Sequence, residues 1–405
     1  MSKSSFFIGQ PIFSQILKFL PRDLVLRVAE NDKADHYCKR FRTYDHVVTM
    51  LYCVLNNCNS LREASTGMLA WEQRLHHLGM EYHPRRSTFS DANNRRSSDV
   101  FEHIYMKLLK RHSPLLSDSR MSRRNSKVYI FDSTTITLFQ EVLRGSGIAP
   151  LKGKRKGGIK VHTLLKSDQD VPCMILFSES AQADTSYLKK VQLPKGSILV
   201  FDKGYNDYST FARFTDEGIT WVTPLRKDAV YTVVKNRTIT EKQKQKGIIS
   251  DQDIILGRGN DKRRTRVRGR LVTYFDKESG DIFSFVTNNL TLAPATIADL
   301  YRKRWQIEVL FKRLKQNYPL KYFLGDSENA IKIQIWCSLI ADLLLKIIKK
   351  SCDRRWSFSN LTSMIRLHLM TYIDLSGFLK CPEKALLRKI KRREKVALNG
   401  SLFPP

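Results

Sequence analysis

Residues 128–134 read VYIFDST, and residues 198–205 read ILVFDKGY. Each stretch is a short run of β-branched and aromatic residues that ends at an aspartate, Asp132 in the first and Asp202 in the second. A buried strand does not easily hold a charge, so each carboxylate is expected at the edge of a sheet, facing a cleft. If the two strands are neighbours, the like charges converge, and a divalent cation is the simplest compensation.

Three further runs of strand-forming residues accompany these two, and a short helical stretch at 184–191 separates the third strand from the fourth. The three runs cover 159–165, 172–177 and 220–222. Five strands with a helix before the fourth predict an α/β layer. Residues 227–290 contain four more strand-like runs between polar turns, without an intervening helix, which predicts a β-rich insertion.

Both ends of the chain show the apolar spacing of helices, over residues 1 to about 120 and from Pro294 to about Tyr372. In the first region, Ser87 is predicted to cap a short helix that runs to Arg96 and has a polar, basic face. Such a face suits the second helix of a helix-turn-helix entering a DNA groove, but also an ordinary solvated surface.

The chain is strongly basic, with 70 Lys+Arg against 39 Asp+Glu in 405 residues and a net charge of +31. This excess favours a polyanionic partner, although a ribosome-associated or anionic-membrane protein would fit the charge equally well. The first residues do not resemble a secretion signal, and the seven scattered cysteines do not form a disulfide framework. The most apolar stretch, 333–348, contains Gln334, Asp342 and Lys346, so it predicts a buried helix rather than a membrane span.

Residues 300–316 read LYRKRWQIEVLFKRLKQ. On one continuous helix, a stripe about 60° wide contains Tyr301, Arg304, Glu308 and Lys315. A neighbouring apolar stripe is expected to pack on the sheet; it consists of Leu300, Ile307, Phe311 and Leu314. The helix by itself would also fit a solvated face with a favourable Glu/Arg pair.

The polar stripe resembles the YREK signature of DDE transposases of the insertion sequence four family, and Asp132 and Asp202 resemble the first two acids of that family. The resemblance covers about residues 127–345. It implies an α/β fold, with a ribonuclease H-like mixed sheet, flanking helices, a β-rich insertion and an N-terminal helical domain. The expected boundaries are an N-terminal DNA-end-binding domain at 1–120, a catalytic domain at 121–226 and 291–375, the insertion at 227–290 and a basic tail at 376–405.

The same resemblance implies a transposase of an insertion sequence, which cuts DNA at the element ends and joins the 3′-hydroxyl ends to target DNA. Asp132, Asp202 and Glu308 are then the catalytic residues and the ligands of two Mg²⁺ ions, or Mn²⁺ in their place. The implied partners are double-stranded DNA, as terminal inverted repeats and as target, and a second copy of the chain in the DNA complex. No membrane is involved, and the expected location is the bacterial cytoplasm, at the nucleoid. The alternatives are a catalytically silent DNA-binding regulator and another ribonuclease H-like nuclease.

Predicted DNA contacts fall on the YREK helix and in two basic segments. They are Tyr301, Arg304, Trp305, Lys315, Lys160, Arg264, Arg266 and Arg268. Trp305 either stacks on a displaced base or packs inside the protein, and Phe283 in the insertion is a second candidate for base stacking. His162, near Lys160 in the same predicted strand, either faces the site or has a structural role.

Overall fold

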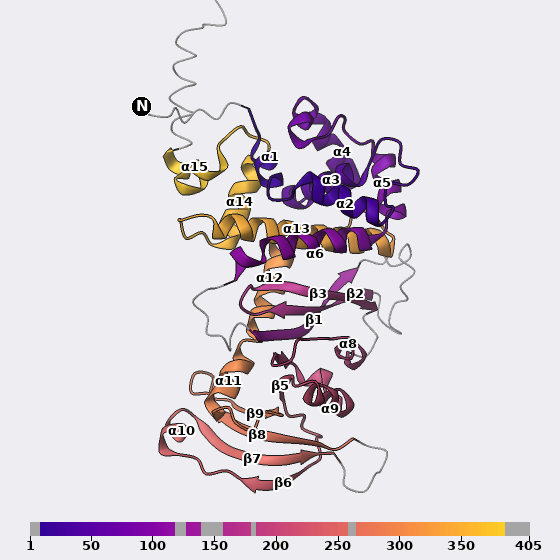
Figure 1. Ribbon diagram of the computed structural model, residues 1–405. Helices are drawn as coiled ribbons and strands as arrows, with labels where there is room; N and C mark the ends of the chain where they lie inside the picture. The colour runs from indigo at the N-terminus through magenta and orange to yellow at the C-terminus, as the bar shows by residue number, and fades with distance from the viewer. Residues whose placement is uncertain (1–8, 118–126, 139–156, 180–183, 258–264, 385–405) are drawn as a thin grey trace, which may run out of the picture. The chain divides into compact units, whose positions relative to one another are not determined.

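The structure is a computed structural model that describes residues 9–117, 127–138, 157–179, 184–257 and 265–384 (Figure 1). These residues form two compact units. We call residues 9–116 and 313–384 the helical unit, and the described residues between 117 and 312 the sheet unit. Across the described ranges, no helix is both long enough and apolar enough to span a bilayer.

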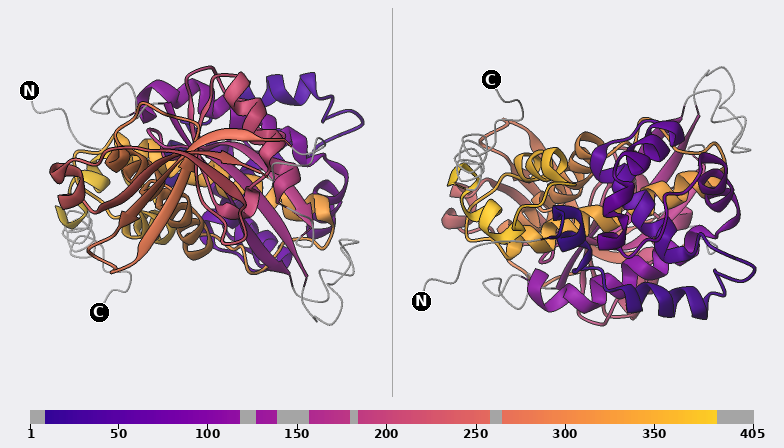
Figure 2. Two further views of the ribbon diagram at one scale, coloured as in Figure 1. Left: turned by 90° about the horizontal axis from the view of Figure 1, so that it is seen from below. Right: turned by 90° about the horizontal axis from the view of Figure 1, so that it is seen from above.

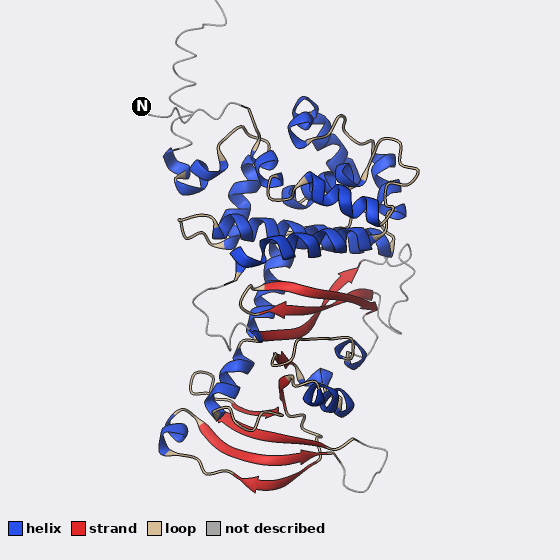
Figure 3. Ribbon diagram, in the orientation of Figure 1, coloured by secondary structure: helices blue, strands red, loops and turns tan. Residues whose placement is uncertain are grey.

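Helices build the described part of the helical unit (Figure 3). They are α1 (Ile12–Leu17), α2 (Arg22–Asn31), α3 (Thr43–Asn56), α4 (Leu61–Ala70), the 3₁₀-helix η1 (Glu72–Leu78), α5 (Arg86–Arg95), α6 (Ser98–Leu116), α13 (Glu328–Lys350), α14 (Phe358–His368) and α15 (Leu375–Lys380). The longest, α13, is buried on all sides over residues 333–348 and packs against α3, α5, α6 and α14.

The polar residues of α13 have partners inside the protein, as a buried helix requires. Gln334 accepts a hydrogen bond from the backbone of Leu324, and Asp342 forms two bonds of 2.9 Å with the guanidinium of Arg313. The prediction of a buried helix is therefore confirmed. The two compact units divide the chain differently from the expected domains. Residues from Arg313 on group with the N-terminal helices, whereas the catalytic domain was expected to extend over 291–375.

Helix α5 also begins differently from the prediction. Its N-cap is Arg85, so Ser87 lies inside the helix and does not cap it. The interior contacts of Phe89 and Asn93, which are buried, decide where this helix lies, and Asn93 contacts His46 of α3 at 2.7 Å. A capping pattern in the sequence could not reveal this tertiary contact.

The sheet unit contains nine strands in the order β3-β2-β1-β4-β5-β9-β8-β7-β6. They are β1 (Val128–Leu138), β2 (Gly157–Lys166), β3 (Val171–Glu179), β4 (Ile198–Phe201), β5 (Thr220–Pro224), β6 (Tyr231–Asn236), β7 (Ile248–Leu256), β8 (Val267–Phe275) and β9 (Ile282–Thr287). The first three strands are antiparallel, and β4 and β5 run parallel to β1. This is the predicted ribonuclease H-like mixed sheet, and its twist makes the strands fan out in Figure 2 (left).

Alternate residues of the central strands face two separate cores. Leu199 and Phe201 point to the core shared with α8 (Thr185–Leu188) and α9 (Tyr208–Asp216). Ile198 and Val200 point to the core shared with α11 (Pro294–Arg302). The central strands are therefore buried on both faces, as their continuous apolar sequences require.

The insertion strands continue the same sheet, because β9 pairs antiparallel with β5. Two α-helices in the described part of the sheet unit were not foreseen. A short one, α10 (Glu241–Gln245), lies inside the insertion, where no helix was expected. The other, α9, lies between β4 and β5, and such a connection is needed because two parallel strands cannot be joined by a tight turn.

Candidate active site

Asp132 and Asp202 follow paired residues on neighbouring parallel strands. Phe131 of β1 is in register with Phe201 of β4, and each aspartate comes next in the chain. Asp202 ends its strand, as expected, but β1 continues past Asp132 to residue 138 because its second half pairs with β2. The two carboxylates are therefore adjacent in the sheet, although only one lies at a strand end.

The surroundings of Asp132 disfavour the charged form of its carboxyl group. Its side chain is 16% exposed, and burial raises its pKa, with the Asp202 carboxylate raising it further. The backbone N–H of Ser133 opposes this shift by donating to Asp132 Oδ1 at 2.8 Å. The Arg304 guanidinium also opposes it, with Nη1 at 2.9 Å from Oδ2. The ionised form thus depends on nearby positive charge.

The predicted single YREK helix is broken in two. Helix α11 ends at Arg302, a turn follows, and α12 (Trp305–Asn317) begins three residues later. In the turn, the N–H of Arg304 donates to the carbonyl of Tyr301 at 2.9 Å, which is the tighter i→i+3 bond. The apolar stripe is buried as predicted, at Leu300, Ile307, Phe311 and Leu314.

The turn places Arg304 between two carboxylates. Its Nη1 binds Asp132, and its Nη2 lies 2.6 Å from Glu308 Oε1. Burial alone would lower the pKa of this guanidinium, but Tyr301, Asp132 and Glu308 together raise it. Tyr301 donates its hydroxyl to Asp202 Oδ1 at 3.4 Å, so the helix pair contacts both strand-borne acids.

The donor set has the chemistry of a magnesium site, since carboxylate oxygens are hard ligands. Within the described residues, however, no three carboxylate, imidazole or thiolate groups lie close enough together to hold a metal ion. Arg304 is the cation that bridges Asp132 and Glu308 in this arrangement. The carboxylates that could hold a divalent cation at this site are those of Asp132, Asp202 and Glu308.

Phe283 and Trp305, each predicted from the sequence as a candidate for base stacking, line one pocket of about 240 Å³. Trp305 is 65% exposed at the start of α12, and Phe283 of β9 is 37% exposed. Phe283 is parallel to Phe285, with ring centroids 6.0 Å apart, and Tyr301 also lines the pocket. Trp305 is therefore not a core residue.

The basic residues named from the sequence are dispersed. Lys160 of β2 is paired with Asp184 at 2.6 Å, whereas Arg266 and Arg268 are exposed at the start of β8. Arg264 lies outside the described residues. Lys315 lies in the part of α12 that belongs to the helical unit, so it is not grouped here with the acids.

His162 is fully buried, which favours the structural alternative. Its Nε2 lies 2.9 Å from Ser178 Oγ, and its ring stacks on Tyr187 with centroids 4.0 Å apart. Burial lowers its pKa to about 4. Asp184 lies 3.8 Å from Nδ1 of His162. The sequence analysis did not identify this contact, because an aspartate beside a short helix has no distinctive sequence pattern.

Comparison with known proteins gives two matching families. The model described as "Transposase DDE domain" matches residues 123–344, and the one described as "Domain of unknown function (DUF4372)" matches residues 8–81. A protein of Sinorhizobium fredii described as a transposase, y4zB, is 28% identical over 65% of this chain and 71% of its own length. A Synechocystis protein, described as a transposase for insertion sequence element IS4SA, is 27% identical over the same shares. A solved structure of piggyBac transposase in a synaptic complex with hairpin DNA aligns with a TM-score of 0.43 and 11% identity, over 100% of this chain and 88% of that chain.

Proposed function

The chain belongs to the family of transposases with a DDE domain, because the family model covers more than half of it, and we propose that it cuts and rejoins the DNA ends of an insertion sequence. Cleavage would expose 3′-hydroxyl ends, which then attack target DNA. The observation that carries the proposal is the adjacency of Asp132 and Asp202 in neighbouring strands, with Glu308 linked to Asp132 through Arg304.

Asp132, Asp202 and Glu308 would hold two Mg²⁺ or Mn²⁺ ions. The raised pKa of Asp132 supports this assignment, because a carboxylate in such a position gains from a cation beside it. The Arg304 bridge supports it as well, since a positive charge already stands between two of the three acids. Bound divalent ions would supply charge neutralisation at the scissile phosphate and an activated oxygen nucleophile.

The residues around the acids have separate tasks in this proposal. Tyr301 holds the Asp202 carboxylate through its hydroxyl. Arg304, when released from Asp132 and Glu308, is well suited to bind a phosphate in a bidentate fashion. Lys315, in the part of α12 that belongs to the helical unit, stays a predicted DNA contact apart from this group. Trp305 and Phe283 offer two aromatic faces at one pocket, which fits a base displaced from the duplex.

We assign DNA-end binding to the N-terminal helices, because a basic groove lies among them. It is lined by α5 and by the loop after α2. Its acids already have partners within the protein: Asp32 contacts His103, Glu72 contacts His83, and Asp91 pairs with Arg95. In the described part of the chain, no ion pair engages the groove cations Lys33, Lys39, Arg40 and Arg85, so these are available for phosphates.

The backbone conformation of Tyr37, which lines this groove, also supports a DNA-binding role for it. Tyr37, in the loop, has a φ of 64° and is 93% exposed. A bulky residue in the left-handed region is strained, and such strain concentrates at functional sites. Charge reversal at Lys39 and Arg40 should weaken binding to the element end, while the same reversal at Lys107 and Lys110, exposed on α6, should weaken it much less.

The decisive test of the activity is a gel assay with a duplex that carries the DNA flanking the coding region. With Mg²⁺, the protein should nick this duplex and produce joined strands, and a chelator should stop both reactions. Asp202→Ala should abolish cleavage and leave DNA binding intact, whereas Asp216→Ala, an exposed aspartate of α9, should cleave normally.

Other results would point to the alternatives. Binding without metal-dependent cleavage by the unaltered protein would identify a silent DNA-binding regulator. Cleavage without joined products would identify a different ribonuclease H-like nuclease. Normal cleavage by the Asp202→Ala protein would refute the site assignment.

We also propose a homodimer in the DNA complex, since two element ends require two active sites. The mass of the complex with end DNA, measured by light scattering, should correspond to two chains. A single chain holding both ends would contradict this proposal.

A further inference from the structure

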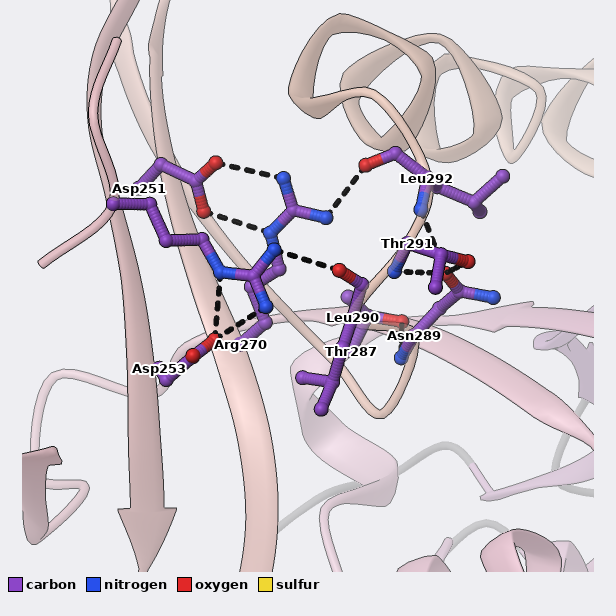
Figure 4. A network of polar contacts seen from close by, with 9 residues as sticks. Asp251, Asp253, Arg270, Thr287, Asn289, Leu290, Thr291 and Leu292 are labelled. Carbon is purple, nitrogen blue, oxygen red and sulfur yellow. Dashed lines mark hydrogen bonds and ion pairs between the residues drawn. The ribbon is translucent and has the colours of Figure 1, made fainter. Parts of the chain in front are cut away.

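The segment that joins β9 to α11, residues 288–293, is held by the β-rich insertion (Figure 4). Arg270 of β8 is only 2% exposed and donates to both carboxylate oxygens of Asp251, at 2.7 Å each. Its remaining terminal nitrogen, Nη1, donates to the carbonyl of Leu292 at 2.5 Å. One buried guanidinium thus ties strands β7 and β8 to the start of α11.

A second arginine also joins an aspartate of β7 to a backbone carbonyl of the same segment. Arg237, which follows β6, pairs with Asp253 at 2.7 Å and donates from Nη1 to the carbonyl of Leu290 at 2.6 Å. Within the segment itself, the side-chain oxygen of Asn289 accepts from the backbone N–H groups of Thr291 and Leu292, at 3.0 and 2.9 Å. The segment is therefore fixed through both its carbonyls and its amides.

The same face of β8 also contacts the body and the end of α11. Val272 and Tyr274, two and four residues after Arg270, belong to the core that contains Ile297 and Ala298 of α11. Arg302, at the last turn of α11, lies over the ring of Tyr274 at 5.1 Å and donates to its hydroxyl. One strand of the insertion therefore holds both ends of this helix.

We propose that Arg270 and Arg237 are positioning residues for the active site: through Leu292 and Leu290 they fix α11, and so the placement of Tyr301, Arg304 and Glu308 against the strand-borne acids. The inference rests on the proposed function, because it concerns the same site. The insertion is then an anchor for the third carboxylate, beyond any contact it makes with DNA.

Two features separate this role from general stabilisation. Ala293, the N-cap of α11, has no side chain that could cap the helix, so the arginine–carbonyl bonds orient its start. Buried ion pairs add little net stability compared with apolar replacements, so stability alone gives a weak reason for two of them here. Every nitrogen of both guanidinium groups also contacts an aspartate or a carbonyl already, which argues against a phosphate site in the adjoining cavity.

The test compares the full-length protein with Arg270→Lys and Arg237→Lys, which keep the charge but cannot bind a carboxylate and a carbonyl in the same geometry. Strand cleavage at saturating end DNA should fall by about 10-fold to 100-fold, because small misplacements of catalytic groups cost this much. The dissociation constant for DNA should stay within about twofold. Amide hydrogen exchange should accelerate in residues 289–304 and remain unchanged in β1 and β4.

A charge swap and a matched control complete the design. Asp251→Arg with Arg270→Asp restores an ion pair but removes the donor to Leu292, so it should recover thermal stability better than cleavage rate. Arg213→Lys is the control, because Arg213 also joins an acid, Glu217, to backbone carbonyls, those of Lys189 and Val191, away from α11. It should leave the rate unchanged.

Three outcomes would overturn the inference: a full rate in both lysine variants, full recovery of rate by the swap, or unchanged exchange in residues 289–304. If Arg270→Lys fails to fold, Arg237→Lys still decides, since its side chain is 25% exposed. The exchange measurement needs no DNA. It therefore tests the anchoring even if the unaltered protein cleaves no substrate, which would refute the proposed function instead.

Discussion

Two strands of the same sheet have opposite surroundings. Every residue of β4 is buried, while every residue of β6 is exposed. The inner strands, β1, β4 and β5, are covered by helices on both faces, whereas the insertion ends in an open edge. Dense packing holds the acids of the inner strands in place, and the outer strands keep cations and aromatic rings available at the surface. In the proposed function, chemistry and substrate contact would thus be separated along one sheet.

The largest expected difference between the two regions is in stability. Phe201→Ala removes a fully buried ring that lies 5.6 Å from Phe211, so the free energy of unfolding should fall by about 3–5 kcal/mol. Val233→Ala in β6 removes a side chain that is already 41% exposed and should change it by less than about 0.5 kcal/mol. Urea unfolding of both variants measures this, and equal losses would show that the edge is packed in solution.

A pH dependence should arise next to the inner strands, through His162 of β2, the strand that pairs with β1. The unfolded chain takes up a proton at this residue near its ordinary pKa of about 6.5, but the folded chain does so only near about 4. The free energy of unfolding should therefore fall as the pH drops through this interval, by up to about 3 kcal/mol. Denaturant titrations at several pH values check this, and His162→Gln should reduce the slope. An unchanged slope in that variant would assign the effect to other groups.

The aromatic rings at the surface of β9 and at the start of α12 should affect DNA processing more than stability. Phe283→Ala and Trp305→Ala remove exposed rings, so processing that needs a displaced base should slow by about 10-fold or more, from a loss of about 1–3 kcal/mol per stacked base. Phe285→Ala is the contrasting variant on the same strand. It is 3% exposed and should destabilise the fold. Fluorescence of 2-aminopurine at the terminal base would report the stacking, and a signal unaffected by Trp305→Ala would exclude that role.

The smallest expected effect belongs to the exposed arginines at the start of β8. Arg268→Ala should reduce the slope of log affinity against log salt concentration by about 1, equally for end DNA and unrelated DNA. The control is Arg226→Ala, since Arg226 is already paired with Asp228 at 2.9 Å. If the slope is unchanged in Arg268→Ala, the start of β8 lies off the DNA path.

The fold class could be read from the sequence because it is set by local patterns. The apolar runs before Asp132 and Asp202 predicted two strands, which the structure confirms; that these strands are neighbours, with Phe131 in register with Phe201, was only a condition at the level of the sequence. The apolar stripe containing Ile307 and Phe311 was also identified correctly. Strand ends were less accurate, because β1 is prolonged by pairing with β2, whose paired residues lie 19 to 37 positions further along the chain.

The sequence by itself determined which residues carry charge and which faces are apolar, since both follow from composition and periodicity. The tertiary structure alone decided how those charges pair. No local pattern shows that the helix breaks before Trp305, that Arg304 lies between Asp132 and Glu308, or that Arg270 reaches the carbonyl of Leu292. Each of these contacts joins segments far apart in the chain or depends on one that does, and its energy comes from groups that meet only after the sheet has formed.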